Sequence, residues 1–334
     1  MRGKVGIVGA GQVGAAAGFL LAQTPGVDAL VLLDQDMARA ASEASDIAHA
    51  AAFGPAAQVA AGDYDDLAGA QLVVIAAGRN LKPGQTRLDL LAANVEVVSH
   101  VLERVLKVAP EAVLLFATNP VDVMPALAVR RFGVPAGQAI GTGCALDSAR
   151  FRDRLARHLG VSAGSVHAYV LGEHGDSEVL HWSGAQAAGM PLARFADELG
   201  RPLSPEICAV IARDVLGSAY RIKEGKGVSN YGIAGCVARL ARAIVNDEQA
   251  VFSVSTFMEE LLGVADTCVS LPHVLGARGA SRPLLPAMDA AETAALRHSA
   301  DLLRDAIRAG LGAALEPSGR SAGAAGPAAS GPPR

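Results

Sequence analysis

Several side chains in this sequence have the types needed to reduce a ketone that lies beside a carboxylate. His174 stands among glycines in LGEHGDSEV, and Asp147 and Arg150 are three residues apart in GTGCALDSARFRDR. Such a reaction needs a proton for the carbonyl oxygen, an anchor for the carboxylate and positive charge near the polarised carbonyl. A histidine with a carboxylate partner can give the proton, and an arginine can hold the carboxylate through its planar guanidinium.

Each of these residues also has an ordinary explanation. A lone histidine is more often a packed or surface residue than a catalyst, and Asp147 and Arg150 at a helix start would form an intrahelical ion pair. Arg87 ends the Gly/Pro loop GRNLKPGQTR, from which it could swing over a substrate and exclude water. The catalytic interpretation therefore depends on a redox cofactor being bound nearby.

A dinucleotide site is predicted at the N-terminus. Gly9, Gly11 and Gly14 form GxGxxG after a short β-branched segment and at the start of an alanine-rich helix. We expect Gly9 to allow the tight turn, Gly11 the approach of a pyrophosphate and Gly14 the close packing of helix on strand. Asp34 ends the next apolar segment about 20 residues later, where it would bind the adenosine ribose and repel a 2′-phosphate. NAD is therefore favoured over NADP.

Apolar strand-like segments alternate with helical ones in the first part of the chain, which predicts a parallel, doubly wound sheet. The pattern of predicted elements changes near Cys144, after which longer helical segments and further strands are expected. The fold class is therefore α/β, with an N-terminal Rossmann domain (residues 1–143), a C-terminal α+β substrate and catalytic domain (144–315) and a low-complexity, disordered tail (316–334).

The individual elements can be predicted from periodicity and end signals. Strands are expected at residues 29–34, 70–78, 112–120, 138–143, 165–172, 251–257 and 267–276. Helical spacing covers residues 88–108, 147–160, 204–224, 231–247 and 289–310. The last helix opens with Asp289 and Glu292 at capping-box spacing.

Composition excludes several classes of function. The net charge is -4 and there is no lysine or arginine run, so neither nucleic acid nor an anionic membrane is an expected partner. Residues 5–27 carry no charge, but the glycines at positions 6, 9, 11, 14 and 18 make a poor membrane helix. The four cysteines are widely spaced without a CxxC pair, which argues against a disulfide framework and a structural metal site and favours a reducing cytoplasm.

The motifs, taken together, resemble the L-lactate/L-malate dehydrogenase family, and its bacterial L-lactate dehydrogenases most of all. The resemblance runs from Lys4 to about Leu311 through GxGxxG…D, KPGQTRLDLLAANV, ATNPVDV, GTGCALDSARFR, VLGEHGDSEV and GKGVSNYGIA. It implies reversible hydride transfer between NADH and pyruvate, a reaction of glycolysis. It also implies His174 as general acid/base, Asp147 as its partner, Arg150 as carboxylate anchor and Arg87 as the mobile-loop arginine.

The resemblance further implies which residues contact the cofactor and substrate. Asn119 would bond both nicotinamide and substrate, in an Asn119–Pro120 pair expected to be cis. The cofactor positions are Gly9, Gly11, Val13, Gly14, Asp34, Arg39, Tyr64, Gly78, Asn80, Asn119 and Thr142. The substrate positions are Leu81, Arg87, Asn119, Arg150 and Ser229.

Leu81 occupies the position that sorts substrates in this family, where arginine pairs the second carboxylate of oxaloacetate and lactate enzymes usually carry glutamine. Leucine cannot neutralise a second carboxylate, so malate should be rejected. Pyruvate is the default substrate. The alternative is an L-2-hydroxyisocaproate-like dehydrogenase for longer or branched 2-oxo acids, which Ser229 favours because it replaces the usual threonine and enlarges the pocket slightly.

The family also implies a homotetramer or dimer. Arg152 and His167 match the pair that binds fructose 1,6-bisphosphate between subunits of allosteric bacterial lactate dehydrogenases, although both have an ordinary explanation as polar surface residues. A non-catalytic NAD-binding protein that kept the fold is the remaining alternative. The intact set of candidate catalytic residues argues against it.

Overall fold

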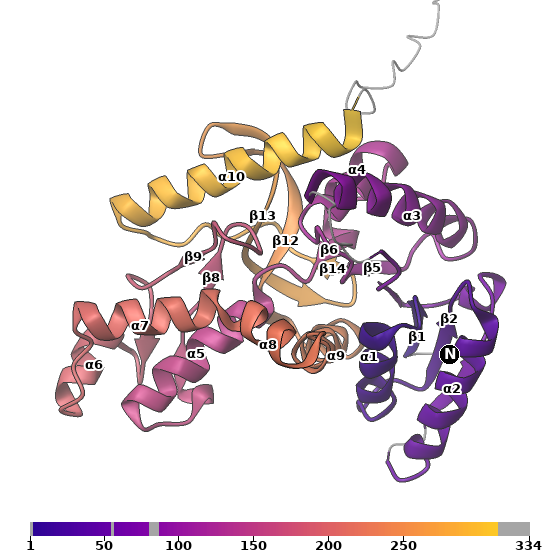
Figure 1. Cartoon of the computed structure of the whole chain (residues 1–334), viewed down its shortest axis with the longest axis horizontal. Helices are drawn as coiled ribbons and strands as arrows, with labels where there is room; N and C mark the ends of the chain where they lie inside the picture. Colours follow the sequence, from indigo (N-terminus) through magenta and orange to yellow (C-terminus); the bar gives the residue numbers. More distant parts are fainter. Residues whose placement is uncertain (1–2, 55–56, 80–86, 313–334) are drawn as a thin grey trace, which may run out of the picture.

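The structure is a computed structural model that describes residues 3–54, 57–79 and 87–312 (Figure 1). The predicted tail lies outside these residues. Strands and helices alternate through the first half of the chain, in the order β1 (Lys4–Val8), α1 (Gln12–Ala22), β2 (Ala29–Leu33), α2 (Met37–Ala51), β3 (Gln58–Ala61), β4 (Leu72–Ile75), α3 (Arg87–Val108), β5 (Val113–Phe116), α4 (Val123–Phe132) and β6 (Ala139–Gly141). The predicted α/β class is confirmed.

The six strands β1 to β6 form a parallel sheet in the spatial order β3-β2-β1-β4-β5-β6. The chain starts at β1, winds outward through β2 and β3 and then returns to β4 on the other side. The carboxyl ends of β1 and β4 therefore flank the point where the winding reverses, which is where open α/β sheets bind ligands.

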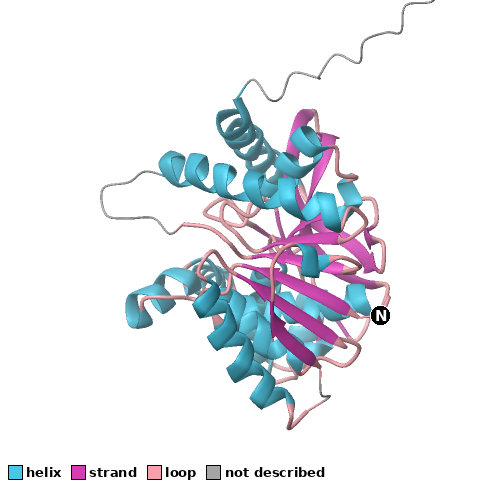
Figure 2. Ribbon diagram, turned by 90° about the vertical axis from the view of Figure 1, so that its right-hand side faces the viewer, coloured by secondary structure: helices cyan, strands magenta, loops and turns pink. Residues whose placement is uncertain are grey.

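Helices cover both faces of this sheet, as Figure 2 shows. One face is packed by α3 and α4 together with the end of α10 (Ala290–Leu311), around Phe116 and Leu102. The other is packed by α1, α2 and α9 (Tyr231–Val245), around Ile7 and Leu32. Because both faces are buried, the strands consist almost wholly of aliphatic residues instead of alternating with polar ones.

The second half begins with α5 (Ala145–Leu159) and continues through short antiparallel strands and further helices. These are β7 (Val166–His167), β8 (Val170–Leu171), β9 (Val179–Leu180), β10 (Gln186–Ala187), β11 (Met190–Pro191), α6 (Leu192–Glu198), α7 (Pro205–Leu216) and α8 (Ser218–Lys226), followed after α9 by β12 (Ala250–Leu261), β13 (Val264–Gly276) and β14 (Gly279–Ala280). The α10 helix begins with the predicted capping box, since the Asp289 and Glu292 side chains each accept a hydrogen bond from the other's backbone N–H.

The β12–β13 hairpin extends the parallel sheet instead of forming a sheet of its own. Ser255 of β12 pairs antiparallel with Gly141 of β6, so the full sheet has nine strands. A Cβ on Gly141 would lie 2.3 Å from the Ser255 Oγ, so glycine is needed for this approach. The sequence did not predict this joining of the two halves.

Some predicted elements differ in detail. The helical pattern at 204–224 is interrupted at Gly217, because the Asp214 carbonyl accepts hydrogen bonds from the Ser218 hydroxyl and the Arg221 guanidinium. The strand predicted at 165–172 is split into β7 and β8, which pair with different partners. The edge strand β3 was not predicted. Within the described residues, no helix is both long and apolar enough to cross a bilayer.

Candidate active site

The turn between β1 and α1 has the geometry expected of a dinucleotide-binding turn. Gly9 has a φ of +103°, which glycine adopts without strain. A Cβ on Gly14 would lie 1.8 Å from the Gly9 carbonyl oxygen, so α1 can pack against the turn only with glycine there. A Cβ on Gly11 would meet no described atom within 4 Å, so this side of the turn leaves room for a ligand. All three predicted roles are consistent with these contacts.

Asp34 is held in place at the end of β2. Its Oδ2 accepts a hydrogen bond from the backbone N–H of Ala10 at 2.8 Å, and its Oδ1 accepts one from Asp36 at 3.0 Å. The carboxylate is therefore fixed beside the glycine turn. Each oxygen keeps a lone pair with which it can bind a ribose hydroxyl.

A cleft of about 1090 Å³ runs along the carboxyl ends of β1, β2 and β4. Six of the predicted cofactor residues line it, namely Gly9, Gly11, Asp34, Arg39, Tyr64 and Gly78. The Arg104 guanidinium lies 3.9 Å from the centre of the Tyr64 ring. The glycine turn, the Asp34 carboxylate and this cleft together have a form that fits the adenosine diphosphate part of NAD.

Two buried polar residues, which the sequence analysis did not single out, fix the loops at the far end of this cleft. The Asn94 side chain on α3 bonds both the N–H and the carbonyl of Arg79 and donates to the Asn119 carbonyl at 2.7 Å. The Thr118 hydroxyl donates to the Ala77 carbonyl at 2.7 Å. The Asn119–Pro120 peptide is cis, as expected. These bonds join the segment after β4 to the segment after β5.

The candidate proton-transfer residues His174, Asp147 and Arg150 lie in contact with one another. The His174 Nδ1–H donates to the Asp147 Oδ2 at 2.6 Å, and the Arg150 Nη1 donates to the Asp147 Oδ1 at 2.8 Å. Asp147 is only 2% exposed, whereas the His174 side chain is 29% exposed. The Asp147 carboxylate therefore pairs with both groups at once and leaves the His174 Nε2 to exchange a proton with a substrate.

These contacts change the pKa values of the pair. Burial alone would lower the pKa of His174, but the charge and hydrogen bond of Asp147, with smaller contributions from Asp122 and Glu178, raise it to about 9. Burial alone would raise the pKa of Asp147, but His174 and Arg150 lower it below its usual value. The ground state is therefore an imidazolium beside a carboxylate.

Asp122 is a further functional candidate that sequence reasoning missed, although it lies within ATNPVDV. It is 2% exposed, and its Oδ2 accepts a hydrogen bond from the backbone N–H of His174 at 2.8 Å. Burial raises the pKa of this carboxyl to about 6, against the opposing effect of His174. Because Asp122 lies two residues after Pro120, its bond to His174 joins the segment after β5 to the loop that carries His174.

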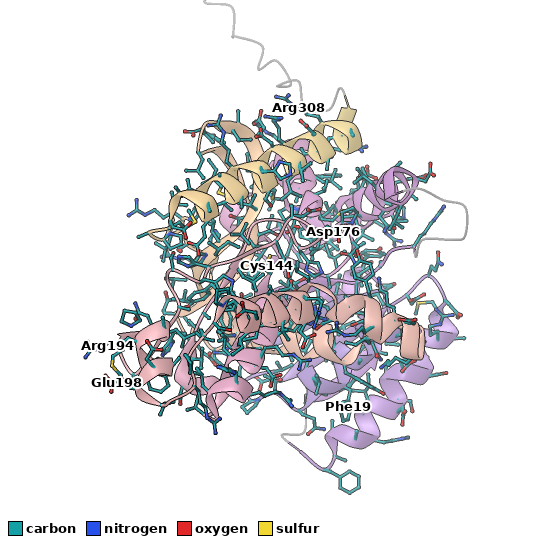
Figure 3. All side chains as sticks on the ribbon, turned by 60° about the vertical axis from the view of Figure 1, so that its left-hand side comes forward. Phe19, Cys144, Asp176, Arg194, Glu198 and Arg308 are labelled. Atoms are coloured by element: carbon teal, nitrogen blue, oxygen red, sulfur yellow. The ribbon has the colours of Figure 1, made fainter. Side chains whose placement is uncertain are left out.

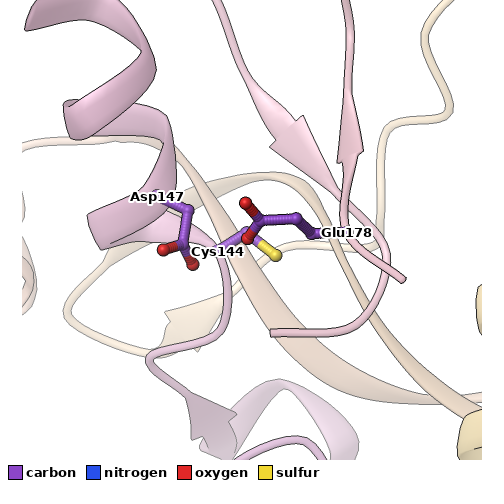
Figure 4. Close-up of side chains that lie close together, drawn as sticks. All are labelled: Cys144, Asp147 and Glu178. Carbon is purple, nitrogen blue, oxygen red and sulfur yellow. The ribbon is translucent and has the colours of Figure 1, made fainter. Parts of the chain in front are cut away.

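Cys144 and Glu178 lie against the Asp147 carboxylate, as Figure 4 shows. One ligand-type atom of each of these three residues lies within 4.8 Å of the other two. Cys144 is in the interior (Figure 3), and burial raises the pKa of its thiol well above the usual value. Since His174 and Arg150 already engage both oxygens of Asp147, a metal ion here would have to displace them, and we assign none.

Some of the remaining predicted residues lie outside the described chain. Asn80 and Leu81 lie outside the described residues, and of Arg87 only the backbone, at the first position of α3, is described. Further positions are described without a contact that assigns a role. Val13 lies on α1, Thr142 is buried after β6, Ser229 is half-buried between α8 and α9, Arg152 is half-buried on α5 and His167 is exposed on β7.

Comparison with known protein families accounts for almost the whole described chain. Residues 3–141 match the NAD-binding domain of lactate/malate dehydrogenases, and residues 144–313 match their alpha/beta C-terminal domain. The chain is 50% identical to an L-lactate dehydrogenase from Thermus aquaticus, over 92% of this chain and 99% of that protein. It is 43% identical to an L-lactate dehydrogenase from Deinococcus radiodurans, over 90% of this chain and 97% of that protein.

Solved structures give the same result. A lactate dehydrogenase from a Medee basin deep-sea metagenome library aligns with a TM-score of 0.89 and 35% identity, covering 93% of this chain and 99% of that one. A minor L-lactate dehydrogenase from Enterococcus mundtii, in a ligand-bound form, aligns with a TM-score of 0.87 and 35% identity, covering 92% of this chain and 98% of that one.

Proposed function

The chain belongs to the lactate/malate dehydrogenase family, and from this premise we propose that it is an NAD-dependent L-lactate dehydrogenase whose proton donor and acceptor is His174. The observation that carries the assignment of roles is the contact of Asp147 with both His174 and Arg150. It supplies, in one cluster, the proton and the carboxylate anchor that reduction of a 2-oxo acid requires.

NADH, held by the β1–α1 turn and the cleft, would supply the hydride that reduces the carbonyl carbon of pyruvate. As charge develops on the carbonyl oxygen, the protonated His174 gives it the proton from Nε2. Asp147 keeps the other ring nitrogen as a donor and stabilises the imidazolium from which the reaction starts. In lactate oxidation the same nitrogen takes the hydroxyl proton, so each direction needs the opposite protonation state of His174.

Arg150 would hold the substrate carboxylate. One of its terminal nitrogens bonds Asp147, which fixes the plane of the guanidinium, and its side chain is 14% exposed. A fixed, planar cation can bind a carboxylate through two parallel hydrogen bonds, which the ammonium of lysine cannot do. Arg87 would add positive charge beside the carbonyl, and Asn119 a hydrogen bond, as their positions in the family imply.

The residues of the β1–α1 turn and of the cleft would hold NAD. The N–H groups at the start of α1 face the glycine turn and suit the pyrophosphate, while Asp34 suits the ribose hydroxyls. A 2′-phosphate would bring a second anion against this carboxylate. NADH should therefore be used in preference to NADPH.

A His174→Ala variant tests the assignment. It should keep its affinity for NADH, measured by fluorescence titration, because His174 lies outside the cleft that fits the cofactor. Its turnover with pyruvate should be lost. A variant that binds NADH and still reduces pyruvate at a rate near that of the wild type would overturn the role of His174.

Oligomeric state and regulation extend this proposal. We propose a homotetramer or dimer, and activation by fructose 1,6-bisphosphate through Arg152 and His167, because the family resemblance implies both. The packing of α5, which carries Arg152, against β7, which carries His167, supports a shared site. Light scattering measures the oligomeric state. A pyruvate saturation curve that the sugar bisphosphate leaves unchanged would contradict the activation proposal.

The two-domain division near residue 143 and the cytoplasmic location are likewise proposals. The division is supported by the limits of the two family matches.

A further inference from the structure

Glu178 is a carboxyl group beside the proton-transfer pair that the proposed function does not use. It directly precedes β9, and its carboxyl group is turned toward that of Asp147 (Figure 4). An oxygen of Glu178 lies within 4.8 Å of an Asp147 oxygen and of the Cys144 sulfur. Its Oε1 is hidden from solvent and has no hydrogen-bond partner among the described residues.

Two ionised carboxylates are unfavourable in this position. Asp147 is the ionised member, because its two oxygens accept hydrogen bonds from His174 and Arg150. A second carboxylate against it would be repelled, and a buried charged oxygen without a donor would add a desolvation penalty. Protonation of Glu178 removes both the repulsion and the desolvation penalty, and it creates a hydroxyl that can donate to a carboxylate oxygen.

The electrostatic environment agrees with this geometry. Burial first, and then the charge of Asp147, raise the pKa of Glu178 to about 8, against the lowering effects of His174 and Arg150. The negative charge of Glu178, once formed, in turn raises the pKa of His174. The two groups therefore titrate in neighbouring pH ranges and influence each other.

We propose that Glu178 is a positioning residue for proton transfer, which as a neutral acid steadies the Asp147 carboxylate toward His174 and as an anion at higher pH keeps the proton on His174. This inference rests on the proposed function, because it concerns the proton that His174 gives to the substrate. Its consequence is that pyruvate reduction persists to a higher pH than the Asp147–His174 pair alone would allow.

Other titratable groups around the pair do not change charge in this range. Burial raises the pKa of the Cys236 thiol to about 12 and that of Cys144 well above its usual value, so both thiols stay neutral. The Arg150 guanidinium stays cationic. Asp122, with a pKa of about 6, ionises before Glu178 does. The groups that face Glu178 and Asp147 come from four parts of the chain. They are Cys144, Asp147 and Arg150 at or near the start of α5, His174 on the loop between β8 and β9, Asp122 just before α4, and Cys236 on α9.

The test is the pH dependence of kcat/KM for pyruvate reduction in Glu178→Gln, with each profile normalised to its own low-pH plateau. Glutamine keeps the size and a donor but cannot ionise. At an effective dielectric constant of about 20, loss of a charge several ångströms from His174 should lower the upper midpoint by about one to two pH units. Near pH 9 this is about a fivefold to fiftyfold lower normalised rate, and the lower limit of lactate oxidation should move by the same number of pH units.

Glu173→Gln is the matched control. It removes the same charge from the residue next to His174, but the Glu173 carboxylate is bonded to the Ser177 hydroxyl at 2.6 Å and is not part of the Asp147 cluster. Because Glu173 is not among the groups that raise the pKa of His174, the midpoint of this variant should move by much less than that of Glu178→Gln. An unshifted midpoint in Glu178→Gln, or equal shifts in both variants, would overturn the proposal, since a purely structural role changes the plateau and not the midpoint.

A measurement on the wild-type protein keeps the proposal testable if Glu178→Gln does not fold. Infrared difference spectra of protein with ¹³C-labelled glutamate, taken between about pH 7 and about pH 10, should show the loss of a protonated glutamic acid band. Complete ionisation of all labelled glutamates below this range would contradict the proposal. Absence of pyruvate reduction in the wild type would instead contradict the proposed function, so the two failures can be told apart.

Discussion

Replacing Asp147 by asparagine should move the pH dependence of pyruvate reduction by about three pH units. The amide keeps the size of the side chain but loses the charge that lies 2.6 Å from the His174 ring nitrogen. Two unit charges about 4 Å apart interact by about 4 kcal/mol at an effective dielectric constant of about 20, which corresponds to about three pKa units. The pKa of His174, raised to about 9 in the wild type, should therefore fall to about 6 in the variant.

This shift has opposite consequences for the two directions of the reaction. Near pH 7.5, His174 would change from almost fully protonated to about 3% protonated, so pyruvate reduction should fall about thirtyfold and recover as the pH is lowered toward about 5. Lactate oxidation should lose less, because it begins from neutral His174. The assay is kcat/KM in both directions from about pH 5 to about pH 10.

Asp153→Asn on the same helix provides the control. Asp153 pairs with Arg157 at 2.8 Å on an exposed part of α5, where its side chain is 46% exposed. This variant should keep the wild-type midpoint. If Asp147→Asn also keeps it, the carboxylate does not hold the proton on His174 and the reasoning is refuted.

Three further changes test other parts of the molecule. Arg150→Lys keeps the charge but loses the planar fork, so kcat/KM for pyruvate should fall by about ten- to a hundredfold in the same assay, mainly through KM. Gly14→Ala places a Cβ 1.8 Å from the Gly9 carbonyl oxygen, so the melting temperature and the NADH affinity should both fall, whereas Gly235→Ala, where a Cβ meets nothing described within 4 Å, should lower neither. Burial lowers the pKa of His273 to about 4, so the unfolded chain binds this proton first as the pH falls. The free energy of unfolding from urea titrations should therefore decrease between about pH 6.5 and about pH 4, and His273→Gln should flatten that decrease.

The dinucleotide turn could be predicted from the sequence because local geometry determines it. Gly9 needs a positive φ, Gly14 needs to lack a side chain, and Asp34 ends the adjacent strand, and each of these requirements acts within one βαβ unit. The ion pair of Asp147 with Arg150 could be predicted in the same way, since residues three apart on a helix lie on one side.

The partnership of Asp147 with His174 could not follow from spacing. The two residues are 27 positions apart, so their pairing could be predicted only from the chemistry of the reaction and from the family resemblance. The functional importance of Asp122 and Glu178 was not predicted, although they lie within the family motifs ATNPVDV and VLGEHGDSEV. Their roles depend on tertiary contacts, such as the bond from His174 to Asp122 across 52 residues, which no local pattern encodes.

The joining of β12 to the parallel sheet was missed for the same reason. A single close approach, Ser255 on Gly141, determines that the C-terminal hairpin continues the N-terminal sheet. The sequence predicts two halves with different patterns of strands and helices, but the pairing of β12 with β6 joins segments more than 100 residues apart, which no local pattern encodes. The resulting continuous sheet lies between two layers of helices.

The most direct test of the central claim is kcat/KM for NADH oxidation with pyruvate, 2-oxoisocaproate, phenylpyruvate and oxaloacetate in parallel. The account predicts the highest value for pyruvate and the lowest for oxaloacetate. His174 donates the proton and Arg150 binds one carboxylate, whereas Leu81 stands where a second cation would be needed for the second carboxylate of oxaloacetate. Efficient reduction of oxaloacetate, or a clear preference for a branched or aromatic 2-oxo acid, would contradict the assignment as an L-lactate dehydrogenase.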